Sequence, residues 1–218
     1  MNPSSTLFTQ CIQNNFVKSE HFAGTTQESR PRGFLIIEIV AVITTLLCVW
    51  LTAKDNILCW PTGIAGSILY LYIFYHARLY SDVILQIYFL GTSIYGWYNW
   101  TYGGAGDTAL KVTRLTMPAM LGWALVTVIG TAALGSFMKR RTKAAIPYGD
   151  ASITILSLVA QYLLTAKVLE SWALWIATDA IATVVYWRRR LYLTAALYSL
   201  LFILACKGLM EWMKLLPQ

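Results

Sequence analysis

The chain has 218 residues, of which 57% are hydrophobic and only 12% are charged. This composition excludes an ordinary soluble domain and indicates an all-α integral membrane protein. The net charge of +7 comes from lysines and arginines clustered between apolar segments. Such clusters set membrane topology, so the basic balance does not predict a nucleic-acid partner.

Residues 1–32 form a polar N-terminal segment that lacks the apolar core of a cleavable signal peptide. Phe8, Ile12 and Phe16 recur at helical spacing, which is compatible with a short amphipathic helix on the membrane surface or with a disordered tail. The rest of the chain contains apolar runs of about 20 residues, the length that crosses a bilayer. These runs predict seven transmembrane helices, over residues 33–52, 57–76, 81–101, 114–136, 150–167, 169–189 and 191–215.

The distribution of positive charge predicts the orientation of the chain. Eleven lysines and arginines fall on the side of the membrane that holds the N-terminus, five fall on the other side, and Lys207 falls within a predicted helix. Because cytoplasmic loops carry the excess of positive charge, the N-terminus is predicted to be cytoplasmic and the C-terminus external.

The sequence contains an internal repeat. The tetrapeptide Leu-Thr-Ala-Lys at 51–54 recurs at 164–167, a numbering offset of 113, whereas Trp60 recurs as Trp172 at a numbering offset of 112. The difference of one predicts a small insertion between otherwise aligned helices. A same-direction repeat in a membrane chain is typical of a transporter whose binding site lies between the two copies.

The repeat pairs the first three predicted helices with the last three and leaves the fourth unpaired. A three-helix unit ends on the opposite side of the membrane from its start, so a second unit in the same direction requires one additional crossing. The predicted fold is therefore two parallel three-helix bundles joined by a linker helix, a 3+1+3 arrangement. The units are the N-terminal segment 1–32, the first bundle 33–101, the linker helix 114–136 and the second bundle 150–215.

Polar and aromatic side chains share one face in three of the predicted helices, at spacings of three, four and seven residues. Polar groups within a bilayer tend to face the bundle interior, where they avoid hydrocarbon. The predicted substrate-binding residues are Gln86 and Trp97 in the third helix, Ser157 and Gln161 in the fifth, and Trp172, Trp175, Asp179 and Tyr186 in the sixth.

The two copies of the repeat differ at these positions. At an offset of 113 Gln161 corresponds to Cys48, and at an offset of 112 Asp179 corresponds to Ser67. The second copy therefore carries the amide, the carboxylate and the indoles. Indoles beside a carboxylate suit a flat, cationic ring, and glutamine can bind amides or hydroxyls. Two structural alternatives remain open, in which the tryptophans lie at the membrane interface and Asp179 only contacts another helix.

The predicted site contains no catalytic motif. A zinc-binding HExxH, a GxSxG nucleophile turn and a Gly-rich phosphate loop are all absent from the sequence. The four cysteines are scattered without metal-ligand spacing. We therefore expect no enzymatic activity, no cofactor and no metal.

Several motifs resemble those of the PnuC family of bacterial vitamin transporters, over about residues 33–215. The residues that carry the likeness are Trp172-x-x-Trp175-x-x-x-Asp179, the preceding Ala160-Gln161 and Lys167, and the helix from Gln86 to Tyr95-Gly96-Trp97. The resemblance implies facilitated diffusion of nicotinamide riboside, a cationic pyridinium nucleoside, across the bacterial inner membrane, followed by trapping through phosphorylation. It also implies a fold like that of the SWEET sugar transporters in inverted orientation, and a homotrimer.

Two alternatives remain for the function. Relatives in this family carry thiamine or riboflavin, and no single residue separates these ligands from nicotinamide riboside. A substrate-binding membrane subunit of an ATP-driven vitamin importer would also be small and helical. The parallel repeat with its linker helix favours a self-sufficient transporter over such a subunit.

Overall fold

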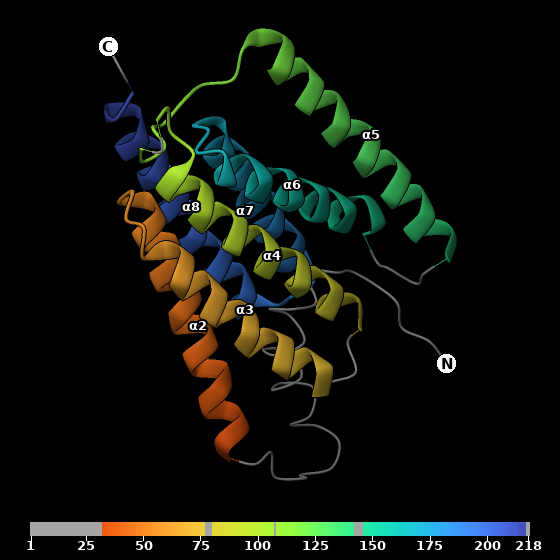
Figure 1. Ribbon diagram of the computed structural model, residues 1–218. Helices are drawn as coiled ribbons and strands as arrows, with labels where there is room; N and C mark the ends of the chain where they lie inside the picture. The colour runs from red at the N-terminus through yellow and green to blue at the C-terminus, as the bar shows by residue number, and fades with distance from the viewer. Residues whose placement is uncertain (1–31, 77–79, 107, 142–145, 217–218) are drawn as a thin grey trace.

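The structure is a computed structural model that describes residues 32–76, 80–106, 108–141 and 146–216 (Figure 1). The predicted amphipathic segment lies in 1–31, outside the described residues. Within the described part all regular structure is helical, and each helix begins and ends within five residues of a predicted span. The helices are α2 (Arg32–Ala53), α3 (Cys59–His76), α4 (Tyr80–Tyr102), α5 (Met117–Arg141), α6 (Pro147–Thr165), α7 (Glu170–Arg188) and α8 (Tyr192–Lys214).

The helix ends follow from local backbone chemistry. Pro147 occupies the first turn of α6, where its missing N–H is not needed. A residue with positive φ comes soon after the end of three helices: Asp55 at 53° after α2, Lys167 at 54° after α6 and Arg190 at 61° after α7. Left-handed residues of this kind terminate helices, although glycine is the usual choice.

The distribution of side chains is that of a protein in lipid. By length and composition, three described helices are apolar enough to cross a membrane, over Ile36–Ala53, Met117–Arg141 and Thr194–Lys214. The other helices carry more polar residues, and several of these face inward: Gln86 and Asp179 are 4% and 5% exposed. Large apolar side chains such as Ile43 and Leu125 are instead exposed on the outside.

The helices pack in a pattern that repeats along the chain. Helix α3 lies between α2 and α4, and α7 lies between α6 and α8. Two further packings, α2 on α8 and α4 on α6, join the first set of helices to the second. Helix α5 packs on α6 and lies along one side of the molecule (Figure 1). The interior between the two sets of helices is where the candidate site lies.

The backbone corrects the register of the repeat. After α2, the Asn56 N–H donates to the Leu51 carbonyl at 3.0 Å, and after α6 the Val168 N–H donates to the Leu163 carbonyl at 3.1 Å. The two bonds are related by the numbering offset of 112, as are the two tryptophans of the repeat. The tetrapeptide match at an offset of 113 is therefore out of register by one position, and the predicted insertion is not needed.

The corrected register changes one predicted correspondence. At an offset of 112, Gln161 corresponds to Val49, so its assignment to Cys48 was wrong. The physical reason is that the backbone sets the register, and Asp55 and Lys167 are the equivalent left-handed residues after α2 and α6. Relative to these two residues, the Leu-Thr-Ala-Lys tetrapeptide lies one position later in the second repeat than in the first. The correspondence of Asp179 with Ser67 is unaffected.

Candidate functional site

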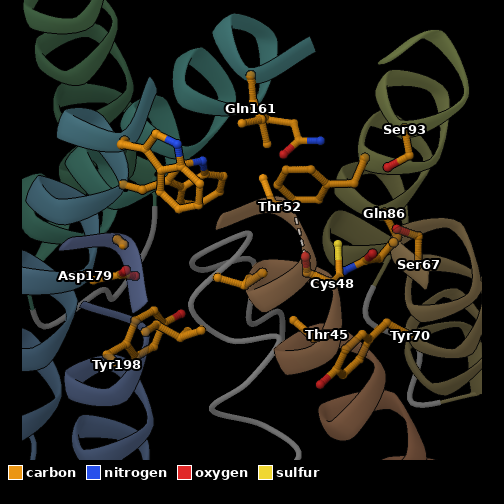
Figure 2. Close-up of a pocket in the computed structure, with 18 residues that line it drawn as sticks. Thr45, Cys48, Thr52, Ser67, Tyr70, Gln86, Ser93, Gln161, Asp179 and Tyr198 are labelled. Atoms are coloured by element: carbon orange, nitrogen blue, oxygen red, sulfur yellow. Dashed lines mark hydrogen bonds between the residues drawn. The ribbon is translucent and has the colours of Figure 1, made fainter. Parts of the chain in front are cut away.

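A cavity of about 180 Å³ lies between the two sets of helices and is lined by residues of α2, α3, α4, α6, α7 and α8 (Figure 2). Fourteen of its eighteen lining residues form pairs at the repeat offset of 112. The pairs are Val49 with Gln161, Thr52 with Leu164, Gly63 with Trp175, Ser67 with Asp179, Gln86 with Tyr198, Phe89 with Leu201, and Ser93 with Ala205. The cavity therefore lies where equivalent surfaces of the two repeats face each other.

The two sides of the cavity differ in chemistry. Figure 2 shows Ser67, Gln86 and Ser93 on one side and Asp179 and Tyr198 on the other. Where the second repeat has the Trp175 indole, the first has only Gly63, and the thiol of Cys48 and the hydroxyl of Ser93 lie close to this glycine. The carboxylate and the indoles of the cavity thus come from the second repeat, whereas the amides of Gln86 and Gln161 come from one repeat each.

Asp179 is the acidic residue of the cavity. It is 5% exposed, and its backbone carbonyl accepts a hydrogen bond from Thr183 one turn later. Among the described residues, none forms an ion pair with its carboxylate. A carboxylate within an apolar protein interior is costly unless a positive group neutralises it. The geometry therefore suits a ligand that brings its own positive charge.

Five of the predicted binding residues line the cavity, namely Gln86, Gln161, Trp172, Trp175 and Asp179. They come from α4, α6 and α7, so residues far apart in the sequence meet at one place. Trp172 is 2% exposed and packs edge-on against Trp212, at 5.6 Å between ring centroids. Its indole lies at the end of the cavity where α6 terminates.

The other three predicted residues do not line the cavity. Ser157 is completely buried in α6, and Tyr186 is completely buried behind the cavity, where its ring stacks on that of Tyr198 at 5.3 Å. Trp97 is 43% exposed on the outside of α4. The buried face of α4 continues through Gly96, and Trp97 follows one residue later, about 100° further around the helix.

Helix α8 contributes three lining residues that polar patterns did not predict. Tyr198, Leu201 and Ala205 lie on an apolar helix without a carboxylate or amide on that face. The repeat contains the signal that could have found them. Gln86, Phe89 and Ser93 share the face of α4 on which the polar pattern was found. Their counterparts in the second repeat, 112 residues later, are these three residues of α8.

An apolar exterior and a cavity lined by six helices are features of a membrane transport protein. The chain belongs to the nicotinamide mononucleotide transporter family, whose model matches residues 35–214. The predicted membership of a family of vitamin transporters is thereby confirmed, and with it the integral membrane character of the chain.

Individual relatives support this assignment. Over 201 residues the chain is 28% identical to the nicotinamide riboside transporter PnuC of Escherichia coli strain K12, covering 81% of this chain and 84% of the relative. It is 22% identical over 178 residues to the riboflavin/roseoflavin transporter RibM of Streptomyces davaonensis, covering 80% and 83%. The crystal structure of the vitamin B3 transporter PnuC has the same fold, with a TM-score of 0.62 and 23% identity over 97% of this chain and 93% of that one.

Proposed function

We propose that this protein takes up nicotinamide riboside by facilitated diffusion. The observation that carries the proposal is the Asp179 carboxylate, which faces the cavity beside Trp175 without an ion-pair partner among the described residues. The pyridinium ring of nicotinamide riboside is flat and positively charged, so it can stack on an indole while the carboxylate balances its charge. The relative from Escherichia coli is a nicotinamide riboside transporter by name.

The two sides of the cavity would hold different parts of this ligand. The pyridinium ring would lie against Trp175, which lines the cavity. The ribose hydroxyls and the carboxamide can both donate and accept hydrogen bonds, which suits the amides of Gln86 and Gln161. Ligand binding would thus join the two repeats across the cavity.

The proposed architecture is the 3+1+3 arrangement, with α2 to α4 and α6 to α8 as two parallel bundles and α5 as the linker helix. The pairing of cavity residues at a constant offset supports it, as does the repeated packing order. The predicted bundles span residues 33–101 and 150–215, and the predicted linker helix spans residues 114–136. The N-terminal segment 1–32 precedes them. A SWEET-like fold and a homotrimer complete this proposal.

In the proposed mechanism one bundle rocks against the other, so that the cavity opens alternately to each side of the membrane. The ligand then moves down its gradient, and phosphorylation inside the cell traps it. The excess of lysine and arginine on one side supports a cytoplasmic N-terminus and an external C-terminus in the inner membrane of a bacterium.

A related vitamin is the second candidate ligand. Thiamine is also a cation with an aromatic ring, whereas riboflavin is neutral, so the Asp179 carboxylate favours thiamine between the two. Riboflavin is a candidate because RibM, a riboflavin/roseoflavin transporter by name, is similar to this chain over 178 residues. A subunit of an ATP-driven importer would bind the same ligands and require a separate ATPase.

Transport by purified protein in liposomes tests the proposal. Labelled nicotinamide riboside should equilibrate across the membrane without ATP and without an ion gradient, and unlabelled nicotinamide riboside should compete better than thiamine or riboflavin. Liposomes without protein measure passive leakage. A requirement for ATP or for a sodium gradient would contradict facilitated diffusion, and stronger competition by another vitamin would change the assigned ligand.

A further inference from the structure

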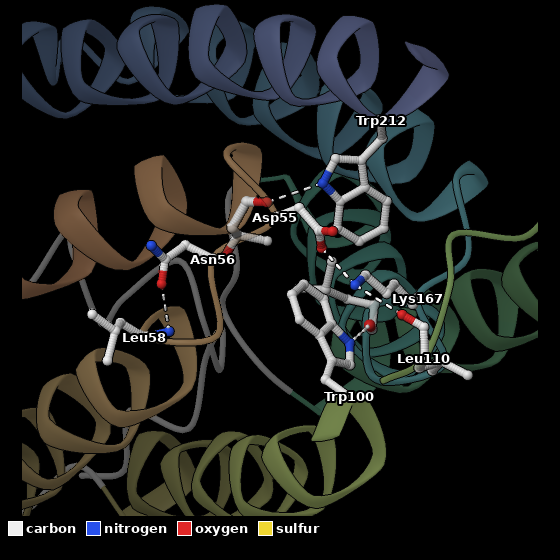
Figure 3. A network of polar contacts seen from close by, with 9 residues as sticks. Asp55, Asn56, Leu58, Trp100, Leu110, Lys167 and Trp212 are labelled. Atoms are coloured by element: carbon white, nitrogen blue, oxygen red, sulfur yellow. Dashed lines mark hydrogen bonds and ion pairs between the residues drawn. The ribbon is translucent and has the colours of Figure 1, made fainter. Parts of the chain in front are cut away.

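An ion pair joins the two repeats at equivalent positions. Asp55 and Lys167 are related by the repeat offset of 112, both have positive φ, of 53° and 54°, and both follow the first helix of their repeat. The Lys167 ammonium lies 2.7 Å from an Asp55 carboxylate oxygen (Figure 3). The two side chains are 8% and 25% exposed, the lysine being the more buried. A pair of opposite charges at equivalent positions must lie on or near the pseudo-twofold axis that relates the repeats.

Two tryptophans form a reciprocal connection around this ion pair. The Trp100 indole N–H donates to the Leu164 carbonyl at the end of α6, and the Trp212 indole N–H donates to the Thr52 carbonyl at the end of α2. Both distances are 3.0 Å, and each member of one bond has its counterpart in the other at the same repeat offset. Each repeat therefore binds the backbone end of the other repeat's first helix.

Four indoles extend this connection into a continuous layer. Trp60 contacts Trp100 at 5.1 Å between centroids, Trp100 contacts Trp212 at 5.6 Å, and Trp212 contacts Trp172 at 5.6 Å. The Lys167 ammonium lies 4.5 Å from the Trp100 ring centroid, within range of a cation–π interaction, and also donates to the Leu110 carbonyl at 2.9 Å. We call these four indoles with Asp55 and Lys167 the closing layer.

The closing layer lies at the end of the cavity where α2, α4, α6 and α8 terminate. Trp172 belongs to both the layer and the cavity lining, so no other layer separates them. The ion pair at the opposite ends of the helices is different, because it joins Asp150 and Arg189 within the second repeat. At the closing layer, by contrast, the ionic contact crosses between repeats, so relative movement of the repeats must stretch it.

We propose that the Asp55–Lys167 pair is the latch that keeps the cavity closed toward the membrane face where α2 and α6 end. This inference rests on the proposed transport function, because only a transporter needs that face to open. In a partly buried pair, the cost of desolvating the charges offsets much of their attraction. The pair therefore specifies the closed position, and when the repeats separate, water hydrates both charges and opening remains reversible.

The equivalence of the two positions makes the latch testable by exchanging its charges. In a variant with Asp55→Lys and Lys167→Asp, the new lysine would approach Trp212, the counterpart of Trp100, from a backbone of the same conformation. The hydrogen bond from Lys167 to the Leu110 carbonyl is lost, because residue 167 is then an aspartate. The exchange should otherwise rebuild the latch, whereas Asp55→Asn or Lys167→Met alone should break it.

Cys48 is a natural reporter of opening, because it lines the cavity (Figure 2). The experiment uses a chain in which Cys48 is the sole cysteine, after replacement of Cys11, Cys59 and Cys206 by alanine. A membrane-impermeant maleimide is applied to each face of oriented vesicles in turn, and the rate of Cys48 labelling is measured. Binding of nicotinamide riboside is measured separately.

In each single variant, the labelling rate of Cys48 from the face where α2 and α6 end should rise tenfold or more, and the rate from the other face should not change. The affinity for nicotinamide riboside should stay within threefold of that of the parent. The exchange variant should return labelling to within threefold of the parent. An unchanged rate, a rise from both faces, or an exchange variant that labels like the single variants would overturn the latch.

Should the single variants fail to accumulate, the exchange variant decides alone: parent-like labelling supports the latch and faster labelling overturns it. Labelling needs no ligand, so an inability to bind nicotinamide riboside would overturn the proposed function without affecting this test.

Discussion

The Trp172 indole lies directly against the backbone of Gly208, where an added Cβ would come within 2.5 Å of a ring carbon. The same relationship holds between Trp60 and Gly96, their counterparts in the first repeat. In both repeats a glycine in the third helix thus admits an indole from the second. A large residue at Gly208 or Gly96 would displace Trp172 or Trp60, and both tryptophans belong to the closing layer.

The variant Gly208→Ala should destabilise the protein by about 1–3 kcal/mol, because overpacking forces the indole or the helix to shift. Thermal unfolding in detergent measures the effect. Gly91→Ala is the matched control, since nothing lies within 4 Å of a Cβ at that position in α4. Equal melting temperatures for the two variants would contradict the contact.

The variant Asp179→Asn should weaken binding of nicotinamide riboside at least tenfold, because a cation in the cavity would lose its counter-charge in a poorly hydrated site. The side chain keeps its size, so expression should not change. Calorimetric titration measures the affinity, and a neutral ligand such as riboflavin serves as the comparison. Similar losses for cationic and neutral ligands would show that the charge itself is not recognised.

The variant Trp175→Ala should weaken binding by about 1–3 kcal/mol, the usual contribution of an aromatic side chain that stacks on a base-like ring. Trp175→Phe should retain part of the affinity. Trp97→Ala is the control, because Trp97 is 43% exposed on the outside of α4 and does not line the cavity. If Trp97→Ala weakened binding as strongly, the site would extend to that side of α4.

The variant Arg189→Ala should destabilise the protein by about 3–5 kcal/mol, since it removes the guanidinium at 2.6 Å from the fully buried Asp150 carboxylate. Thermal unfolding again provides the measurement. Lys214→Ala breaks an exposed ion pair with Glu211 and should change stability little. Adding Asp150→Asn to Arg189→Ala should recover part of the loss, because it removes the unpaired charge.

The fold was largely predictable because each helix is an apolar run bounded by polar residues. The helix bounds were least accurate at α5, which continues to Arg141 instead of ending near residue 136. The last turn of α5, beyond the predicted span, contains Lys139, Arg140 and Arg141. Long basic side chains can extend from a helix end toward water, so charge alone does not terminate a helix.

The candidate site was predictable where a polar or charged side chain interrupts an apolar helix, as Gln161 and Asp179 do. Trp97 fits the same spacing after Ser93, but the structure buries Gly96 because the Trp60 indole needs the space above a glycine. Such a contact depends on a neighbouring helix and is invisible in the pattern of α4 alone. The identical tetrapeptides likewise gave a repeat offset that was wrong by one residue, because identical side chains do not imply the same backbone conformation.

The pairing of cavity residues has an evolutionary consequence. Fourteen of the eighteen lining residues lie at paired positions, so a mutation in one member of a pair alters one wall of the cavity while its counterpart on the other wall is unchanged. Gly63 and Trp175 illustrate the result, because the same position has no side chain in one repeat and an indole in the other. A cavity lined in this way can acquire a new specificity through one of its walls while the other wall keeps its shape.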